Sequence, residues 1–308
     1  MKRDYQYYKK SFQGVQMPFA FLDRDVLDEN IEELCKRSGN KKIRIATKSI
    51  RSTWVFDYLL EKKEQIQGLM CYTVQEAAWL AEKGFDDLLV AYPCFHEKDI
   101  ESIIPHIKNG KTIYLMTDLD AHLEKIQQVA KKHDATIPVC LDMDMTTTFP
   151  GVYFGVYRSS VKDLASAKKY FTKLQECPNL RLGALMGYEA QIAGVGDNSP
   201  YQKMLNPIIR ILKKKSIPKI AKRRKQIYDL ALEMGFKPEV VNAGGTGSLE
   251  SSREEECVTE VTIGSGFYAS HLFDHYKIFK HSPAAVYAIE IVRQPKKDIY
   301  TCLGGGYV

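Results

Sequence analysis

Two glycine turns, 244–248 and 264–266, carry residue types that bind phosphate groups. Each directly follows an apolar run, within NAGGTGS (242–248) and IGSGFY (263–268). Glycines let backbone N–H groups approach an anion closely, and the start of a helix, expected after the second turn, favours negative charge. Plain chain reversals are the alternative interpretation. The predicted phosphate-binding residues are Gly244, Gly245, Thr246, Gly264, Ser265, Gly266 and Tyr268.

A lysine closes an apolar run much earlier in the chain, KIRIATK at 42–48. An unprotonated amine is a nucleophile toward an aldehyde. Pyridoxal 5′-phosphate offers both an aldehyde for such an amine and a phosphate for the glycine turns. We therefore predict this cofactor, attached to Lys48 through a Schiff base. For Lys48 taken alone, a solvated surface charge is the alternative.

Eight short apolar runs are candidates for the strands that position these groups. Each is nearly continuous in apolar residues, as is typical of a strand covered on both faces. The runs are 42–48, 66–72, 87–93, 112–118, 136–144, 180–188, 239–245 and 259–266. Amphipathic helical stretches lie between them, near 25–37, 74–83, 96–108, 119–132, 160–176 and 201–235. This alternation predicts an α/β fold, a (β/α)8 TIM-type barrel, with an open eight-stranded sheet as the alternative.

The barrel explains how distant residues could share one site. In this fold the active site lies at the C-terminal ends of the strands, and phosphate commonly binds after strands 7 and 8. Those are the strands that precede the two glycine turns. Strand 1 neighbours strand 8 in a closed barrel, so we expect Lys48 within reach of the bound phosphate.

The two ends of the chain depart from the alternating pattern. Residues 1–20 are aromatic and basic, without a helical period. Residues 286–293 and 299–303 read as two strands around a turn at 294–297. We predict a barrel over 21–280 and an incomplete C-terminal β-domain over 281–308, on which residues 1–20 pack. The stop after LGGGYV suggests a truncated chain.

The order of several segments resembles the fold-type III pyridoxal-phosphate enzymes, a superfamily that includes alanine racemase. Within them it looks most like the branch of D-threonine aldolase and D-serine dehydratase (D-serine deaminase-like proteins). The segments include ATKS (46–49), LDMD (141–144), VYRSS (156–160), GALMGYEAQI (183–192), NAGGTGS and TEVTIGSGFY (259–268). The resemblance covers roughly residues 17–280.

The resemblance implies roles for two further residues. Arg158 would lie near the pyridine nitrogen of the cofactor, and Tyr188 beside its ring. A surface ion pair is the alternative for Arg158, and a core hydroxyl for Tyr188. Asp142 and Asp144 fall on one face of their run and could order Arg158 or the substrate, or be buried structural carboxylates.

Two departures from that branch concern histidines and a metal. The branch carries a histidine-containing run before its lysine, whereas Arg44-Ile45-Ala46-Thr47 stands here. The branch also places a divalent metal in its C-terminal β-domain, on His with Asp or Cys. The only histidines here with ligand-like spacing are His271 and His275, which we interpret as surface or interface residues. A metal therefore remains possible, but we identify no ligands.

Charge and composition limit the class of partner. The formal net charge is +6, and eight of the positive charges lie within 213–225. We interpret that segment as a solvated helix face, with an anion or nucleic acid as the alternative. No apolar run reaches the length of a membrane span. The seven cysteines are scattered without a CxxC pair, which favours reduced thiols and a cytoplasmic location.

Together these features predict an enzyme whose catalytic residues are Lys48, Tyr188 and Arg158. The resemblance implies a homodimer, and we expect a small amino acid of D configuration as substrate, without a nucleic-acid or membrane partner. The reaction would be aldol cleavage, β-elimination with deamination, or racemisation. Two alternatives stay open: a non-catalytic protein that binds pyridoxal phosphate, and a cofactor-free aldolase that uses Lys48 on a sugar phosphate.

Overall fold

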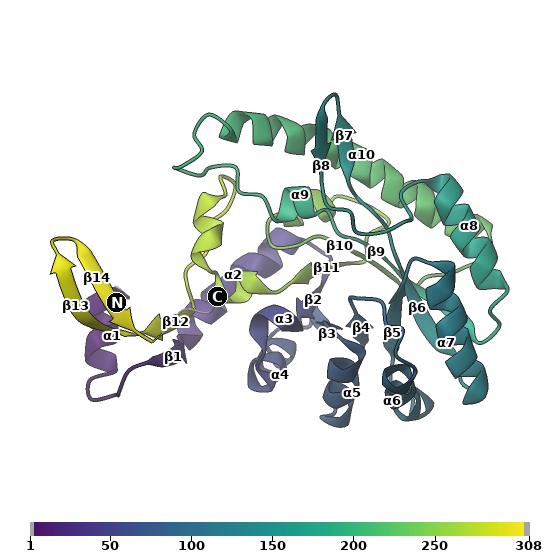
Figure 1. Cartoon of the computed structure of the whole chain (residues 1–308), viewed down its shortest axis with the longest axis horizontal. Helices are drawn as coiled ribbons and strands as arrows, with labels where there is room; N and C mark the ends of the chain where they lie inside the picture. Colours follow the sequence, from purple (N-terminus) through teal and green to yellow (C-terminus); the bar gives the residue numbers. More distant parts are fainter. Residues whose placement is uncertain (1–2, 305–308) are drawn as a thin grey trace.

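A computed structural model describes residues 3–304 and shows eight parallel strands closed into a barrel (Figure 1). The strands are β2 (Lys42–Ala46), β3 (Ile66–Cys71), β4 (Leu88–Val90), β5 (Ile113–Thr117), β6 (Ile137–Asp142), β9 (Leu180–Gly187), β10 (Val240–Ala243) and β11 (Glu260–Ile263). The ring closes where β11 pairs in parallel with β2. The predicted (β/α)8 barrel is therefore confirmed, and the open sheet is excluded.

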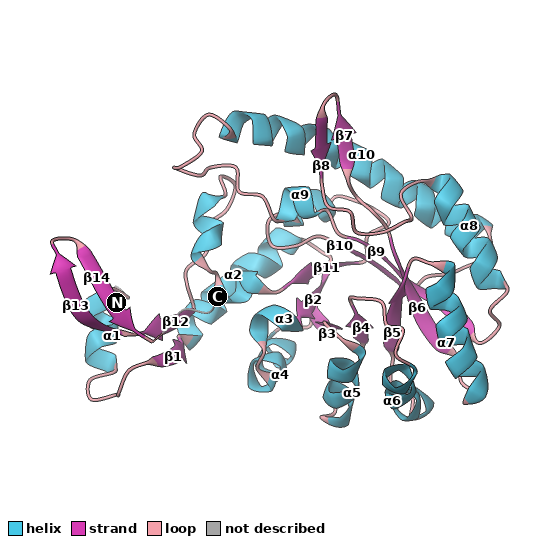
Figure 2. Cartoon of the chain, in the orientation of Figure 1, coloured by secondary structure: helices cyan, strands magenta, loops and turns pink. Residues whose placement is uncertain are grey.

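Helices surround the barrel (Figure 2). The longer ones are α2 (Arg24–Ser38), α4 (Thr53–Lys62), α5 (Val74–Glu82), α6 (Glu97–Lys108), α7 (Asp120–Lys132), α8 (Leu164–Gln175) and α10 (Asn206–Glu233). Local signals explain their bounds: Thr73 caps α5 by accepting a hydrogen bond from the Glu76 N–H. The sequence predicted all of these helices except α4.

Short elements follow several strands at the C-terminal end of the barrel. They are the one-turn helices α3 (Thr47–Ile50), α9 (Ala190–Ala193), α11 (Leu249–Ser252) and α12 (Ser265–Tyr268), the 3-10 helix η1 (His271–His275), and the hairpin of β7 (Thr147–Phe149) and β8 (Val152–Phe154). Neither the hairpin nor α3 was predicted from the sequence. The predicted first strand extends through Lys48, whereas β2 ends at Ala46.

The main hydrophobic core lies between the barrel and its helices, and a smaller cluster fills the barrel interior. Alternate residues of a strand face opposite sides, so Ile43 and Ile45 of β2 pack in the main core while Arg44 does not. Arg44 is fully buried and pairs with Glu260 of β11 and with Asp87. A buried arginine is stable here because carboxylates and carbonyls take up its donors.

The chain ends form small sheets beside the barrel (Figure 1). Strand β1 (Phe19–Leu22) pairs in antiparallel fashion with β12 (Ala285–Ala288), and β13 (Glu290–Lys296) forms a hairpin with β14 (Ile299–Leu303). Helix α1 (Tyr5–Ser11) precedes them, capped by Asp4, although residues 1–20 lack a helical period. The domain boundaries proposed above remain a prediction.

The basic segment 213–225 lies within α10, which continues through Pro218. Most of its charges are exposed, but Lys213 and Arg224 are buried. Arg224 pairs with Glu189 and Glu255, so part of the basic run stabilises the fold. Across residues 3–304, no helix combines the length and apolar character that crossing a bilayer requires.

Candidate functional site

A cavity of about 210 Å³ lies at the C-terminal ends of the barrel strands. It brings together most of the predicted site residues: Lys48, Arg158, Tyr188, Gly244, Gly245, Thr246, Gly264 and Ser265. Gly266 and Tyr268 lie just behind the wall. A Cβ at Gly266 would lie 2.7 Å from the Thr246 side chain, so this glycine lets the two turns touch. The Tyr268 hydroxyl donates to the Ile50 carbonyl (3.0 Å) and thereby supports α3.

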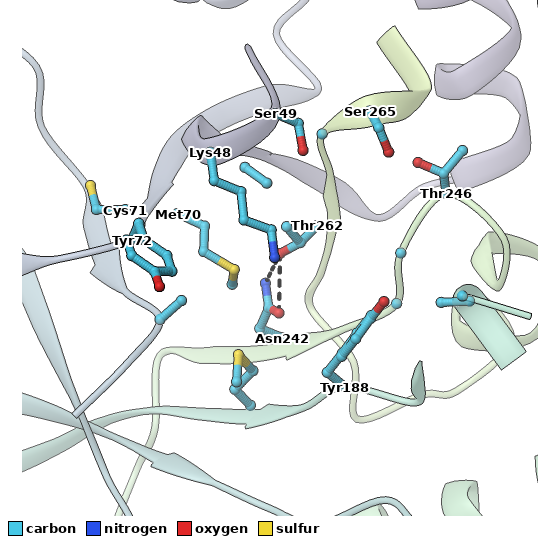
Figure 3. A pocket seen from close by; sticks show the side chains of 18 of the residues that line it. Lys48, Ser49, Met70, Cys71, Tyr72, Tyr188, Asn242, Thr246, Thr262 and Ser265 are labelled. Carbon is cyan, nitrogen blue, oxygen red and sulfur yellow. Dashed lines mark hydrogen bonds between the residues drawn. The ribbon is translucent and has the colours of Figure 1, made fainter. Parts of the chain in front are cut away.

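Lys48 lies in α3, directly after β2. Its side chain extends into the cavity toward Thr262 and Asn242 (Figure 3). Two contacts fix the turn that carries it: the Thr47 hydroxyl donates to the Met70 carbonyl (3.1 Å), and Arg51 Nε donates to the Lys48 carbonyl (3.0 Å). The amine is thus presented by a backbone that neighbouring elements hold in place.

The two glycine turns form another part of the cavity wall. Gly244 has a φ of +78°, which favours glycine. A Cβ on Gly264 would lie 2.8 Å from Ser49 Oγ and 2.9 Å from the Ala46 Cβ, so the second turn packs tightly on α3. The hydroxyls of Ser49, Thr246 and Ser265 gather on this side (Figure 3). Helix α12 is a single turn, so it supplies N–H groups and little dipole.

Buried charged residues hold the first glycine turn. Arg37 of α2 donates to the Thr246 carbonyl (2.7 Å) and pairs with Glu250 (2.6 Å). On the other side, the fully buried Glu189 accepts from Ser248 Oγ (2.8 Å) and pairs with Arg224 (2.9 Å). The sequence analysis assigned a role to neither Arg37 nor Glu189. Of the two, only Glu189 could have been suspected from the sequence, because it directly follows Tyr188 at a strand end.

Arg158 projects into the cavity from the chain that follows the β7–β8 hairpin. Its Nε lies 2.8 Å from Asp142 Oδ2, and its backbone N–H donates to Asp144 (3.1 Å). Both aspartates are buried, as the structural interpretation expects, and both also contact Arg158, which was the other role considered for them. Burial raises the pKa of Asp142 to about 7, although Arg158 opposes this shift.

Tyrosines surround the arginine. The guanidinium carbon of Arg158 lies 5.6 Å from the Tyr92 ring centre and 5.9 Å from that of Tyr188. Burial raises the pKa of the Tyr188 hydroxyl. Tyr72 packs edge-to-face against Tyr92, with ring centres 4.9 Å apart. Both Tyr72 and Tyr92 line the cavity but were not predicted, because nothing in the sequence distinguishes them from core aromatics.

The floor of the cavity is polar. Asn242 and Thr262 exchange hydrogen bonds there (dashed lines in Figure 3), at 2.8 and 3.1 Å. Asn242 Nδ2 also donates to Glu260 (2.7 Å), which in turn pairs with Arg44. A carboxylate only accepts, so Glu260 fixes the orientation of the Asn242 amide.

Within residues 3–304, no group of three His, Cys, Asp or Glu side chains is arranged to hold a metal ion. His271 and His275 lie at the two ends of η1. His271 Nδ1 lies 2.9 Å from Asp274, and its side chain is largely exposed.

Comparison with known proteins identifies similar sequences and folds. The model of the alanine racemase N-terminal domain family matches residues 22–271. D-threonine aldolase from Filomicrobium marinum superposes with a TM-score of 0.74 at 16% identity, covering 92% of this chain and 71% of that one. D-threo-3-hydroxyaspartate dehydratase from Delftia sp. HT23 gives 0.72 at 17% identity, covering 91% and 68%. Alanine racemase from Clostridium difficile 630 gives 0.64 at 16%, covering 90% and 70%. No curated protein sequence matches the chain.

Proposed function

We propose that this chain, which belongs to the alanine racemase N-terminal domain family, is a pyridoxal-phosphate-dependent enzyme that acts on an amino acid. The observation that carries the proposal is the single cavity that joins the Lys48 side chain to both glycine turns. An amine for the aldehyde and a wall of donors for the phosphate are the two features that this cofactor requires.

The residues around the cavity fit the cofactor chemically. The wall at Gly244 and Gly264 leaves no space for a Cβ without strain or collision, so backbone N–H groups can approach an anion. Thr246 and Ser265 add hydroxyl donors. Tyr188 offers an aromatic face. When bound, pyridoxal phosphate would supply an aldehyde for amines and a ring that takes up electrons released at the substrate Cα.

The protein residues would then bind, orient and move protons. The Lys48 amine would act as general base at the substrate Cα or at a β-hydroxyl, and would return the proton afterwards. Arg158, which offers donors only, would keep a facing ring nitrogen unprotonated. An unprotonated ring nitrogen makes the ring withdraw electrons less strongly from the substrate Cα, so negative charge at the Cα would be short-lived. Asp142 would hold Arg158 in this position.

We further propose a small amino acid of D configuration as the substrate. Support comes from two structural neighbours whose names specify D-threonine and D-threo-3-hydroxyaspartate. Aldol cleavage, β-elimination and racemisation all begin at the Cα or the β-hydroxyl, within reach of one lysine. The homodimer, the cytoplasmic location and any divalent metal remain predictions.

Borohydride trapping tests the attachment. The purified protein is loaded with pyridoxal phosphate, its visible spectrum is recorded, and reduction is followed by peptide mapping. We expect a visible absorption band and a pyridoxyl group on Lys48. Lys48→Ala should abolish both. Lys42→Ala should keep both, because Lys42 lies at the opposite end of β2 and donates to the Glu64 carbonyl (2.9 Å).

Other outcomes select the alternatives. Reduction that labels a different lysine would refute the assignment of Lys48. A labelled Lys48 without turnover of D-serine, D-threonine or D-alanine would favour a non-catalytic cofactor-binding protein. Failure to bind the cofactor, together with trapping by borohydride only when a sugar phosphate is present, would favour the cofactor-free aldolase.

A further inference from the structure

A second cavity, of about 580 Å³, adjoins the first on the side of Lys48. Lys48 and Tyr72 line both cavities, so the two spaces adjoin at these residues. The second cavity lies between the start of α4 and the start of α5, and its wall includes Trp54 and Trp79, both about half exposed. A ligand joined to the Lys48 end of the first cavity can therefore extend into the second.

The charges around the second cavity favour an anion. Arg51 and Lys48 are its cations, and Glu76 is its acid. Glu76 is engaged locally, because its Oε2 accepts a hydrogen bond from the Tyr72 N–H at 2.6 Å. In the first cavity, Arg158 is already paired with Asp142. Arg51 therefore stands out as the guanidinium beside the lysine whose charge is not offset by a carboxylate.

Arg51 has free donors that can bind a ligand. Its Nε donates to the Lys48 carbonyl, but its two Nη groups donate to no residue in 3–304, and it forms no ion pair there. A guanidinium held at Nε keeps a rigid pair of donors, which matches the two oxygens of a carboxylate. Lys48 lies in α3, and Arg51 caps the C-terminal end of that helix three residues later.

The backbone of Arg51 is unusual. It has φ +51° and ψ +36°, the left-handed conformation that glycine adopts easily and arginine rarely. Within residues 3–304, the other non-glycine residues with positive φ are Ala269 and three aspartates, which tolerate this conformation better. Backbone strain of this kind is concentrated at functional sites, so it directs attention to the Arg51 side chain.

We propose that Arg51 binds the α-carboxylate of the substrate amino acid whose amino group reacts at the Lys48 position. This inference rests on the proposed function and adds the residue that recognises the substrate. Holding the carboxylate at Arg51 and the amino group at Lys48 fixes two of the four Cα substituents. The other two, the side chain and the Cα hydrogen, then take defined directions.

A ligand pair that differs only in charge tests this assignment. Holoenzyme is titrated with D-serine and with D-serinamide, following the change in the cofactor spectrum. In Arg51→Gln, the D-serine concentration that gives half of the spectral change should rise 10- to 100-fold. The corresponding D-serinamide concentration should change less than 2-fold. Arg51→Lys, which keeps the positive charge, should restore part of the preference for D-serine over D-serinamide. Lys83→Ala is the control: this cation lies over the Trp79 ring outside the cavity and should leave both titrations unchanged.

The variant Arg51→Gly separates binding from folding. Glycine suits the left-handed backbone, so the melting temperature should stay the same or rise while discrimination between acid and amide disappears. Equal weakening of both ligands in Arg51→Gln, or a wild-type protein that does not distinguish them, would refute the role of Arg51. A wild-type protein that lacks the Lys48-linked spectrum, or whose spectrum responds to neither ligand, would instead refute the proposed function.

Discussion

Glu189 links two parts of the site that are far apart in sequence. It follows Tyr188 at the end of β9, and its carboxylate accepts from Ser248 and Ser252 beyond β10. Arg224 of α10 supplies the opposite charge. A buried carboxylate with this many donors is held in one position. The tyrosine expected beside the cofactor ring is therefore held in register with the turn expected to bind the phosphate.

His281 lies behind the same turn and gives the protein a pH dependence. Its Nε2 lies 2.8 Å from Arg37 Nη1, and Glu250 is the other charged group on this arginine. Arginine only donates, so Nε2 accepts and Nδ1 carries the proton. Burial, and then the charge of Arg37, lower the pKa of His281 from 6.5 to about 4.

We predict that acidification destabilises the fold through His281. Between pH 6.5 and pH 4 the unfolded histidine is protonated while the folded one stays neutral. The unfolded state thus binds more protons, and the free energy of unfolding falls by on the order of 2 kcal/mol as the pH drops through this window. In urea unfolding across this pH window, the free energy of unfolding should fall less steeply with pH in His281→Gln than in the wild-type protein. The exposed control His271→Gln should keep the wild-type slope, and equal slopes in all three proteins would contradict the prediction.

At the scale of elements, the second glycine turn packs closely against Ala46 at the end of β2 and Ser49 of α3. We predict that Gly264→Ala weakens the loading of pyridoxal phosphate at least 10-fold. Its Cβ would push the turn away from Ala46 and Ser49, and overpacking of this kind costs about 1–3 kcal/mol. Cofactor titration measures the weaker binding of pyridoxal phosphate, and urea unfolding measures the loss of stability.

Gly84→Ala is the matched control for strain. Gly84 has φ +102° with nothing within 4 Å of its hypothetical Cβ, so alanine strains the backbone at the end of α5, outside the barrel mouth. That variant should lose stability and keep its cofactor affinity. A Gly264→Ala protein with normal affinity would show that the turn does not bind the phosphate.

The sequence predicted regular elements well and the connections at the barrel mouth poorly. Apolar runs mark buried strands, so all eight barrel strands were found, with ends displaced by a few residues. The run that ends in Lys48 was read as strand throughout, because periodicity does not show where β2 stops and the one-turn α3 begins. The β7–β8 hairpin was missed since its polar TTT gives no alternating pattern.

Site residues were predictable where they directly follow barrel strands, because the active site of this fold lies at those strand ends. Lys48 and the glycine turns follow strands, and a closed barrel brings strand ends together. Arg51, Arg37 and Tyr92 were not predicted, because their importance depends on side-chain contacts between elements distant in sequence. Tyr268 was predicted to bind the phosphate, which stays a prediction; its hydroxyl donates to the Ile50 carbonyl.

At the scale of the whole molecule, the seam where β2 meets β11 depends on Arg44. We predict that Arg44→Met costs about 3–5 kcal/mol, because it leaves Glu260 and Asp87 without their cation. Arg44→Met combined with Glu260→Met should cost less than the single change. Urea unfolding measures both. The control Arg181→Ala breaks an exposed pair with Glu239 and should cost less than about 1 kcal/mol. Similar losses for Arg44→Met and Arg181→Ala would contradict the prediction.

The pairing of β1 with β12 has a consequence for how the protein is made. The whole barrel lies between these two strands along the chain. During synthesis from the N-terminus, β1 emerges first and has no partner until β12, which follows the last barrel strand, has left the ribosome. Its FAFL segment must therefore stay unpaired, and open to contacts with other chains, for most of translation.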